Sequence, residues 1–158
     1  MIPRGSHQIK IGTILDGFRI VPAYLLLGVL KHLVPLRSLA KWTWCEAAGP
    51  RDRLAERRLA ANVLRLSKLL RIADRDCLQR SLLLYRLLSA AGADPELVVG
   101  FREQDAKIIG HAWVLVDGKS LVEPESDLVR FSPVLRFGAR GALLSQMRAG
   151  CEPRTTAS

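Results

Sequence analysis

Two residues of this sequence have side chains and positions suited to nucleophilic catalysis, Cys77 and His111. Cys77 comes at the first turn of an expected helix, and the positive end of a helix dipole favours the reactive thiolate. His111 lies within an apolar segment typical of a strand, where an unpartnered imidazole costs free energy. An imidazole that faces the thiol would accept its proton and later return it to a leaving amine.

Taken singly, each residue has a plainer interpretation. Cys77 would be a buried core cysteine and His111 a structural histidine with satisfied hydrogen bonds. Their order favours chemistry, because a cysteine followed by a histidine on a separate element is the pattern of a papain-type or transglutaminase-type site.

A third group should orient the imidazole, and Glu123 is the carboxylate that we favour. Asp117 follows His111 by six residues, about 20 Å along a strand, so it is better explained as part of a turn. Glu123 lies on the strand expected to return from that turn. Asp127 and Glu125 are the alternatives.

The register of this hairpin decides which face Glu123 occupies. A strict two-residue turn at Asp117-Gly118 would pair Ala112 with Glu123, on the wrong face of the sheet. A bulged turn would pair Trp113 with Glu123 and bring the carboxylate to the face of His111. We expect the bulged turn.

The elements that must position these residues divide the chain into a helical first half and a second half with strands. Helices are expected over residues 22–33, 36–45 and 51–72, with a break at Gly49-Pro50. Asp74-Arg75-Asp76 is a helix-start signal for a buried helix over residues 77–91, which is apolar nearly all round. Gly92 and Pro95 end it.

After Pro95 the apolar period becomes that of strands. Strands are expected over residues 96–101, 108–116 and 119–123, with Asp117-Gly118 as the turn between the last two. The tail from Arg130 shows little pattern. The fold class is therefore α+β, a helical N-terminal half packed on a small antiparallel sheet.

Composition limits the function classes. The chain has 158 residues, 49% hydrophobic, so it can bury a core and is not a disordered protein. Its net charge of +9 suggests an anionic partner, which could be nucleic acid, lipid or an acidic peptide. Three cysteines without a CxxC spacing argue against a disulfide framework and a zinc site, and favour a reducing, cytoplasmic compartment.

The domain boundaries follow from these patterns. The first seven residues, MIPRGSH, are typical of a tag remnant. Residues 8–158 are expected to form one domain, with residues 8–72 as its helical part and residues 73–130 as its catalytic core. The apolar run over residues 20–30 is too short to cross a bilayer.

Four elements in fixed order now identify a family. The sequence resembles the transglutaminase-like leader peptidases of lasso-peptide biosynthesis over about Asp76 to Pro124. The elements are CLQRSLLLYRLL from Cys77 to Leu88 with Gly92 after it, ELVVG from Glu96 to Gly100, HAWV from His111 to Val114, and Asp117-Gly118.

The resemblance implies a transglutaminase/papain-like core and a cysteine peptidase that removes the leader of a ribosomally made precursor. Cys77 matches the family's nucleophile and His111 its general base. The third member is usually Asp about a dozen residues after the histidine, and here Glu123 holds that position. The longer side chain can still orient an imidazole. No metal or cofactor is implied.

The resemblance also implies partners. These are the precursor peptide, a separate leader-recognition protein and an ATP-dependent cyclase that closes the macrolactam. Contact with a membrane surface stays open, since Trp42 and Trp44 could anchor to a membrane or to the partner protein, although packing under the long helix is the favoured alternative.

Three residues near the pair are candidates for lining the substrate cleft. Ser81 and Tyr85 follow Cys77 by one and two helical turns and share its face, while Trp113 shares the face of His111. Packing within the core is the alternative for all three.

Two rival functions remain at this point. An acyl transferase or amidase would use the same Cys–His pair and yield a product with an added amine. A basic binding module would need neither residue, but no helix-turn-helix signature or basic–aromatic interleaving supports a nucleic-acid partner.

Overall fold

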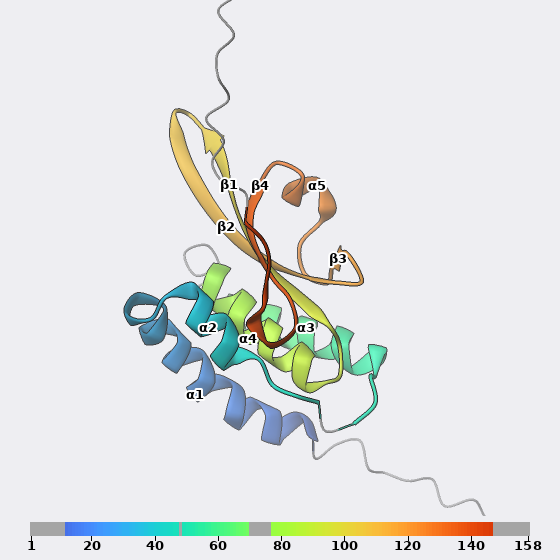
Figure 1. Cartoon of the computed structure of the whole chain (residues 1–158). Coiled ribbons are helices and arrows are strands. Elements are labelled where there is room, and N and C mark those ends of the chain that lie inside the picture. Colours follow the sequence, from blue (N-terminus) through green and yellow to red (C-terminus); the bar gives the residue numbers. More distant parts are fainter. Residues whose placement is uncertain (1–11, 48, 70–76, 147–158) are drawn as a thin grey trace, which may run out of the picture.

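Helices come first along the chain and strands follow, as the sequence predicts. The computed structural model describes residues 12–47, 49–69 and 77–146. Its main helices are α1 (Gly12–Leu33), α2 (Leu36–Thr43), α3 (Arg53–Leu69) and α4 (Cys77–Ala90). They form one layer beneath the sheet (Figure 1). The α+β prediction is confirmed.

The first helix differs from its predicted bounds. Pro22 lies inside α1, not at its start. A proline within a helix removes one backbone hydrogen bond, and here the helix continues on both sides of it. The predicted helix-start signal at residues 74–76 and the tag remnant at residues 1–7 lie outside the described residues.

The sheet has five antiparallel strands in the order β3-β2-β1-β4-β5. Their bounds are β1 (Pro95–Gln104), β2 (Lys107–Val116), β3 (Lys119–Ser120), β4 (Ser132–Phe137) and β5 (Leu143–Gln146). A short helix, α5 (Glu125–Leu128), and a 3-10 turn, η1 (Ala139–Gly141), complete the fold. Strands β4 and β5 lie in the tail where the sequence shows little pattern, because β4 buries fully only its last residue, Phe137, and β5 none.

The turn between β2 and β3 is the strict two-residue form, so the bulged turn is wrong. Asp117 and Gly118 have φ of 53° and 76°, as in a type I′ turn, and Val116 pairs with Lys119. Strand β3 ends at Ser120. Glu123 therefore pairs with no residue of β2, and the chain leaves the sheet before reaching it.

This turn is tied to the helical layer by ion pairs. Arg51 binds buried Glu56 at 2.5 Å and Asp117 at 2.8 Å. The guanidinium holds the pKa of the exposed Asp117 carboxyl below its ordinary value. One arginine thus links the end of β2 to the start of α3.

Helix α4 is the centre of the molecule. It contacts α1, α2, α3, β1 and β2, and the apolar residues of its middle are buried. Gly92, with φ of +83°, ends it in the left-handed conformation that glycine adopts without strain. The prediction of a buried central helix is confirmed.

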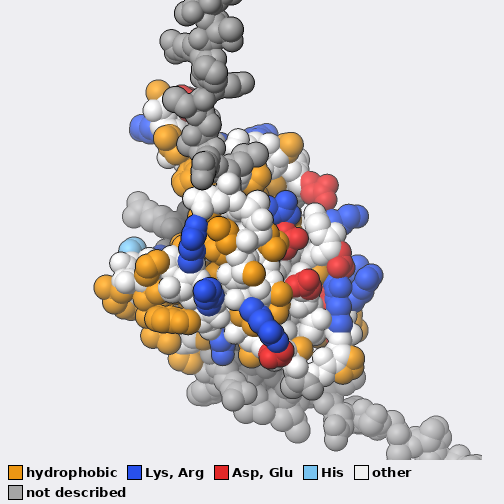
Figure 2. Space-filling model, viewed as in Figure 1, with side chains coloured by type: hydrophobic (Ala, Val, Ile, Leu, Met, Phe, Trp, Pro, Cys, Tyr) orange, Lys and Arg blue, Asp and Glu red, His pale blue; other side chains and the backbone are white. Residues whose placement is uncertain are grey.

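One face of α1 stays exposed. Hydrophobic side chains gather over this helix in Figure 2, and the exposed ones are Val21, Leu25, Leu26, Val29 and Leu33. Within the described residues, none of the helices combines the length and the apolar character that crossing a membrane requires.

Tyr85 joins α4 to the C-terminal strands. Its fully buried hydroxyl donates a hydrogen bond to the Gly138 carbonyl at 2.5 Å and accepts one from the Gly141 N–H at 3.1 Å. Burial raises the pKa of Tyr85 to about 12, so the hydroxyl stays protonated.

We expect Tyr85→Phe to lower the free energy of unfolding by about 0.5–1.5 kcal/mol, because the Gly138 carbonyl and the Gly141 N–H each lose one hydrogen bond and keep the one between them. Urea denaturation followed by circular dichroism measures this loss. Arg86→Ala, at the exposed neighbouring position, should change stability by less than about 0.5 kcal/mol. Equal stability of Tyr85→Phe and the parent chain would contradict the assignment.

Candidate active site

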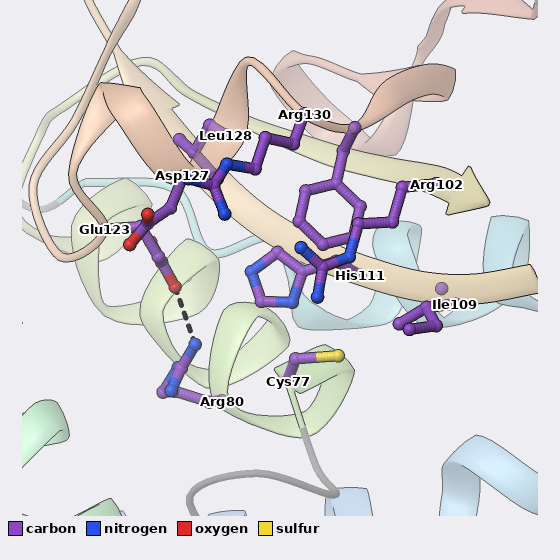
Figure 3. Close-up of a pocket in the computed structure, with 11 residues that line it drawn as sticks. Cys77, Arg80, Arg102, Ile109, His111, Glu123, Asp127, Leu128 and Arg130 are labelled. Atoms are coloured by element: carbon purple, nitrogen blue, oxygen red, sulfur yellow. Dashed lines mark hydrogen bonds and ion pairs between the residues drawn. The ribbon is translucent and has the colours of Figure 1, made fainter. Parts of the chain in front are cut away.

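An open pocket of about 510 Å³ lies where the start of α4 meets β2 and the segment around α5 (Figure 3). Cys77 and His111 both line it, one from the helix and one from the strand. The structure therefore brings the two predicted catalytic residues to one site.

A buried hydrogen bond fixes the relation between helix and strand at this point. The Ser81 hydroxyl donates to the Ala112 carbonyl at 2.8 Å. Ser81 follows Cys77 by one helical turn, and Ala112 follows His111 directly. This contact holds the cysteine's helix against the histidine's strand.

His111 lies in an aromatic environment. Its ring stacks with Trp113 at a centroid distance of 6.0 Å and contacts the Phe131 ring at 5.0 Å. Gly100 pairs with His111 across the sheet, and a Cβ there would come within 2.9 Å of the Trp113 ring and 2.6 Å of a backbone oxygen of Ser132. Glycine at position 100 thus makes room for this ring packing.

The environment favours the neutral imidazole. Burial lowers the pKa of His111 below its ordinary value of 6.5 and outweighs the opposing effect of the Glu123 charge, while the charges of Arg80 and Arg102 lower it further. At neutral pH the ring is unprotonated, the state in which it can accept a proton.

Glu123 reaches the pocket by a route that the sequence did not predict. It lines the pocket after the chain has left β3, and its carboxylate binds Arg80 at 2.6 Å and the Ser120 hydroxyl at 2.9 Å. Figure 3 shows it directed at Arg80. Both side chains of this ion pair are only 12–13% exposed. Glu123 therefore acts on His111 through its charge.

The two alternative carboxylates differ in their position relative to the pocket. Asp127 lines the pocket, whereas Glu125 is exposed in the first turn of α5 and is not among the lining residues. Asp127 is exposed too.

The three residues expected to line the substrate cleft are not part of the pocket wall. Ser81 and Tyr85 are buried, with their hydroxyls bonded to backbone groups of β2 and of the segment around η1. Trp113 is 5% exposed and packs beside His111. These contacts assign all three a structural role, because their polar or aromatic groups are already engaged in the interior.

The lining residues that the sequence did not point to include Arg102, Arg130 and Phe131. Arg102 lies two residues after Gly100 on β1, and Gly100 pairs with His111, so strand alternation puts Arg102 on the histidine's face. Predicting β1 to end at residue 101 hid this signal. Phe131 and Arg130 lie in the tail, where no pattern pointed to them.

In the part of the chain that the structure describes, no three His, Cys, Asp or Glu side chains cluster as a metal site would require. The chemistry of the pocket is that of a thiol, an imidazole and charged side chains.

Comparisons with known proteins agree with this geometry. Residues 20–136 match the family model of the transglutaminase-like superfamily, which spans both the helical layer and the sheet. No curated protein and no solved structure matches the chain. Members of the superfamily are usually cysteine peptidases or acyl transferases. With a cysteine at the start of its central helix and a histidine on the adjoining strand, the chain belongs to the transglutaminase-like superfamily.

Proposed function

We propose that this chain is a cytoplasmic cysteine peptidase that removes the leader from a ribosomally made lasso-peptide precursor. The observation that carries the peptidase proposal is the shared pocket of Cys77 and His111, with the imidazole held neutral. The precursor class is supported by the resemblance of residues 76–124 to the leader peptidases of lasso-peptide biosynthesis.

The proposed reaction uses the pair in two steps. His111 accepts the thiol proton, and the Cys77 sulfur attacks the carbonyl carbon at the leader–core junction. The bond to the core amine breaks, His111 donates the proton to that amine, and the leader stays bound as a thioester. Water, deprotonated by His111, then hydrolyses the thioester and releases the leader.

The oxyanion formed in each step needs hydrogen-bond donors. Cys77 is the first residue of α4, and the first N–H groups of a helix have no partner within it. We assign the Cys77 backbone N–H as one donor.

Glu123 is the carboxylate that we assign to support His111. Its negative charge favours the imidazolium that forms when the thiol loses its proton. Its ion pair with Arg80 fixes it to the same helix that carries Cys77.

The partners follow from the proposed reaction. The precursor peptide is the substrate, a separate leader-recognition protein presents it, and an ATP-dependent cyclase takes the freed core. An acyl transferase would share every step up to the thioester and would then use an amine in place of water, so the products distinguish the two.

We expect Cys77→Ala and His111→Ala to lower the rate of precursor cleavage by a factor of about a thousand or more, because each removes half of the pair. Mass spectrometry of the precursor, incubated with the chain and the leader-recognition protein, follows leader and core. Cys45→Ala is the matched control and should cleave normally. Cleavage by folded Cys77→Ala would refute the mechanism. A leader that carries an added amine would show that the chain transfers the acyl group to an amine and does not hydrolyse the thioester.

The pH dependence should follow the lowered pKa of His111. Cleavage should persist at pH 6.5 and fall only as the pH drops through that lower pKa, because protonated His111 cannot accept the thiol proton. The fold should also lose stability as the pH falls below 6.5, since the unfolded chain binds the proton more readily. NMR titration of the imidazole, assigned with His111→Ala, measures the pKa. A value above 6.5 would contradict this environment.

Glu123→Gln should lower the pKa of His111 further and slow cleavage by about 10- to 100-fold, because a charge that favours the imidazolium is lost. Loss of the Arg80 ion pair should also cost roughly 1–3 kcal/mol of stability. The same NMR titration separates the two effects, since unfolding alone would not shift the pKa of the folded fraction.

Asp127→Asn is the matched control, because Asp127 lines the pocket but is exposed. It should leave the pKa of His111 nearly unchanged. A larger shift in this variant than in Glu123→Gln would make Asp127 the supporting carboxylate.

A further inference from the structure

We propose that the substrate peptide carries a carboxylate beside the bond that Cys77 attacks, and that Arg102 and Arg130 bind this carboxylate. The proposal rests on the proposed function, because it places the peptide in the pocket of Cys77 and His111.

The charges on the pocket wall are unbalanced. Its ionised side chains are three arginines, Arg80, Arg102 and Arg130, and two carboxylates, Glu123 and Asp127. Arg80 and Glu123 neutralise each other in a nearly buried ion pair. Within the described residues, Arg102 and Arg130 form no ion pair. Arg102 is partly buried, whereas Arg130 and the remaining carboxylate, Asp127, are both exposed.

Arg102 is held in place but incompletely bonded. Its guanidinium carbon lies 4.9 Å from the centroid of the Phe131 ring, and the same ring contacts His111. Its buried Nε has no hydrogen-bond partner among the described residues. An unbonded, buried N–H of a charged group is costly, and a carboxylate is the acceptor that matches two parallel guanidinium donors.

Arg130 approaches from a different part of the chain. Arg102 belongs to β1, whereas Arg130 lies in the connection from α5 to β4. Figure 3 shows the Arg102 side chain above Cys77 and beside His111, and the Arg130 side chain extending across the same pocket toward Asp127. Two guanidinium groups from separate segments can hold one carboxylate between them and thereby fix the direction of a peptide.

A bound carboxylate would also assist the chemistry. The charge of Arg102 disfavours the imidazolium of His111 in the empty pocket. A substrate carboxylate on Arg102 would offset this charge at the moment when His111 must accept the thiol proton. Binding of an acidic peptide would thus also raise the basicity of the His111 ring.

The test needs no knowledge of the precursor. Cys77 of the full chain is alkylated with iodoacetate, which carries a carboxylate, and with neutral iodoacetamide, and the two rate constants are compared by mass spectrometry. Cys45 in the same molecule is the internal reference. We expect the iodoacetate-to-iodoacetamide ratio to be higher at Cys77 than at Cys45.

Substitution then tests the two arginines. Arg102→Gln and Arg130→Gln should each lower the ratio at Cys77 by roughly three- to tenfold, because a charge-assisted contact is lost. Arg102→Lys should retain part of it. Arg58→Gln, which removes an exposed charge on α3, is the matched control and should leave the ratio unchanged.

The outcomes separate this proposal from the proposed function. If Cys77 reacts with both reagents but its ratio equals that of Cys45 and does not change in the variants, the carboxylate site is refuted while the nucleophile stands. If Cys77 reacts with neither reagent in the folded chain, both proposals fail.

Protection of Cys77 from iodoacetamide identifies the source of the carboxylate. We expect an amidated peptide with an internal Glu to protect better than its Gln counterpart, because the proposed reaction needs chain on both sides of the bond. Protection only by a peptide with a free C-terminus would support the carboxylate site and assign it to a chain end. Equal protection by acidic and neutral peptides would overturn the proposal.

Discussion

The contact of α4 with β2 is the constraint on which the site depends. Cys77 begins the helix, His111 lies within the strand, and the Ser81–Ala112 hydrogen bond joins the two elements between them. The apolar middle of α4 buries this contact, so the pair is placed by the hydrophobic core itself. The Ser81–Ala112 hydrogen bond then fixes the position of the helix along the strand, which burial of apolar side chains alone would not determine.

The same burial sets the charge state of the site. Withdrawal of the imidazole from water favours its neutral form, and the nearby guanidinium groups act in the same direction. Glu123 opposes them, but its carboxylate is shared with Arg80. The imidazole of His111 is thus neutral and able to accept a proton, but it binds that proton only moderately well. This suits a general base that must return the proton to a leaving group.

Strong periodic signals in the sequence made the elements that carry Cys77 and His111 predictable. The nearly all-apolar helix after Cys77 and the alternating strand around His111 each have one reasonable placement, and the structure has both. Glu123 lines the pocket, but without the predicted strand pairing, because a turn sequence fixes the hairpin but not where its second strand ends. Arg102 and Phe131 were missed because β1 was predicted too short and β4 buries too little to show a pattern.

The ion pair of Glu123 gives a physical reason for a glutamate at position 123, where the resemblance to the leader peptidases implies an aspartate. The chain leaves the sheet at Ser120, so the carboxylate must span from an irregular segment to α4. The additional methylene of Glu provides that reach, and Arg80 lies on the same helix as Cys77. The departure from the family pattern and the buried Arg80 contact are therefore one feature. This ion pair ties the segment that leads to Arg130 and Phe131 to the helix that begins with Cys77, so this part of the pocket wall is held to that helix.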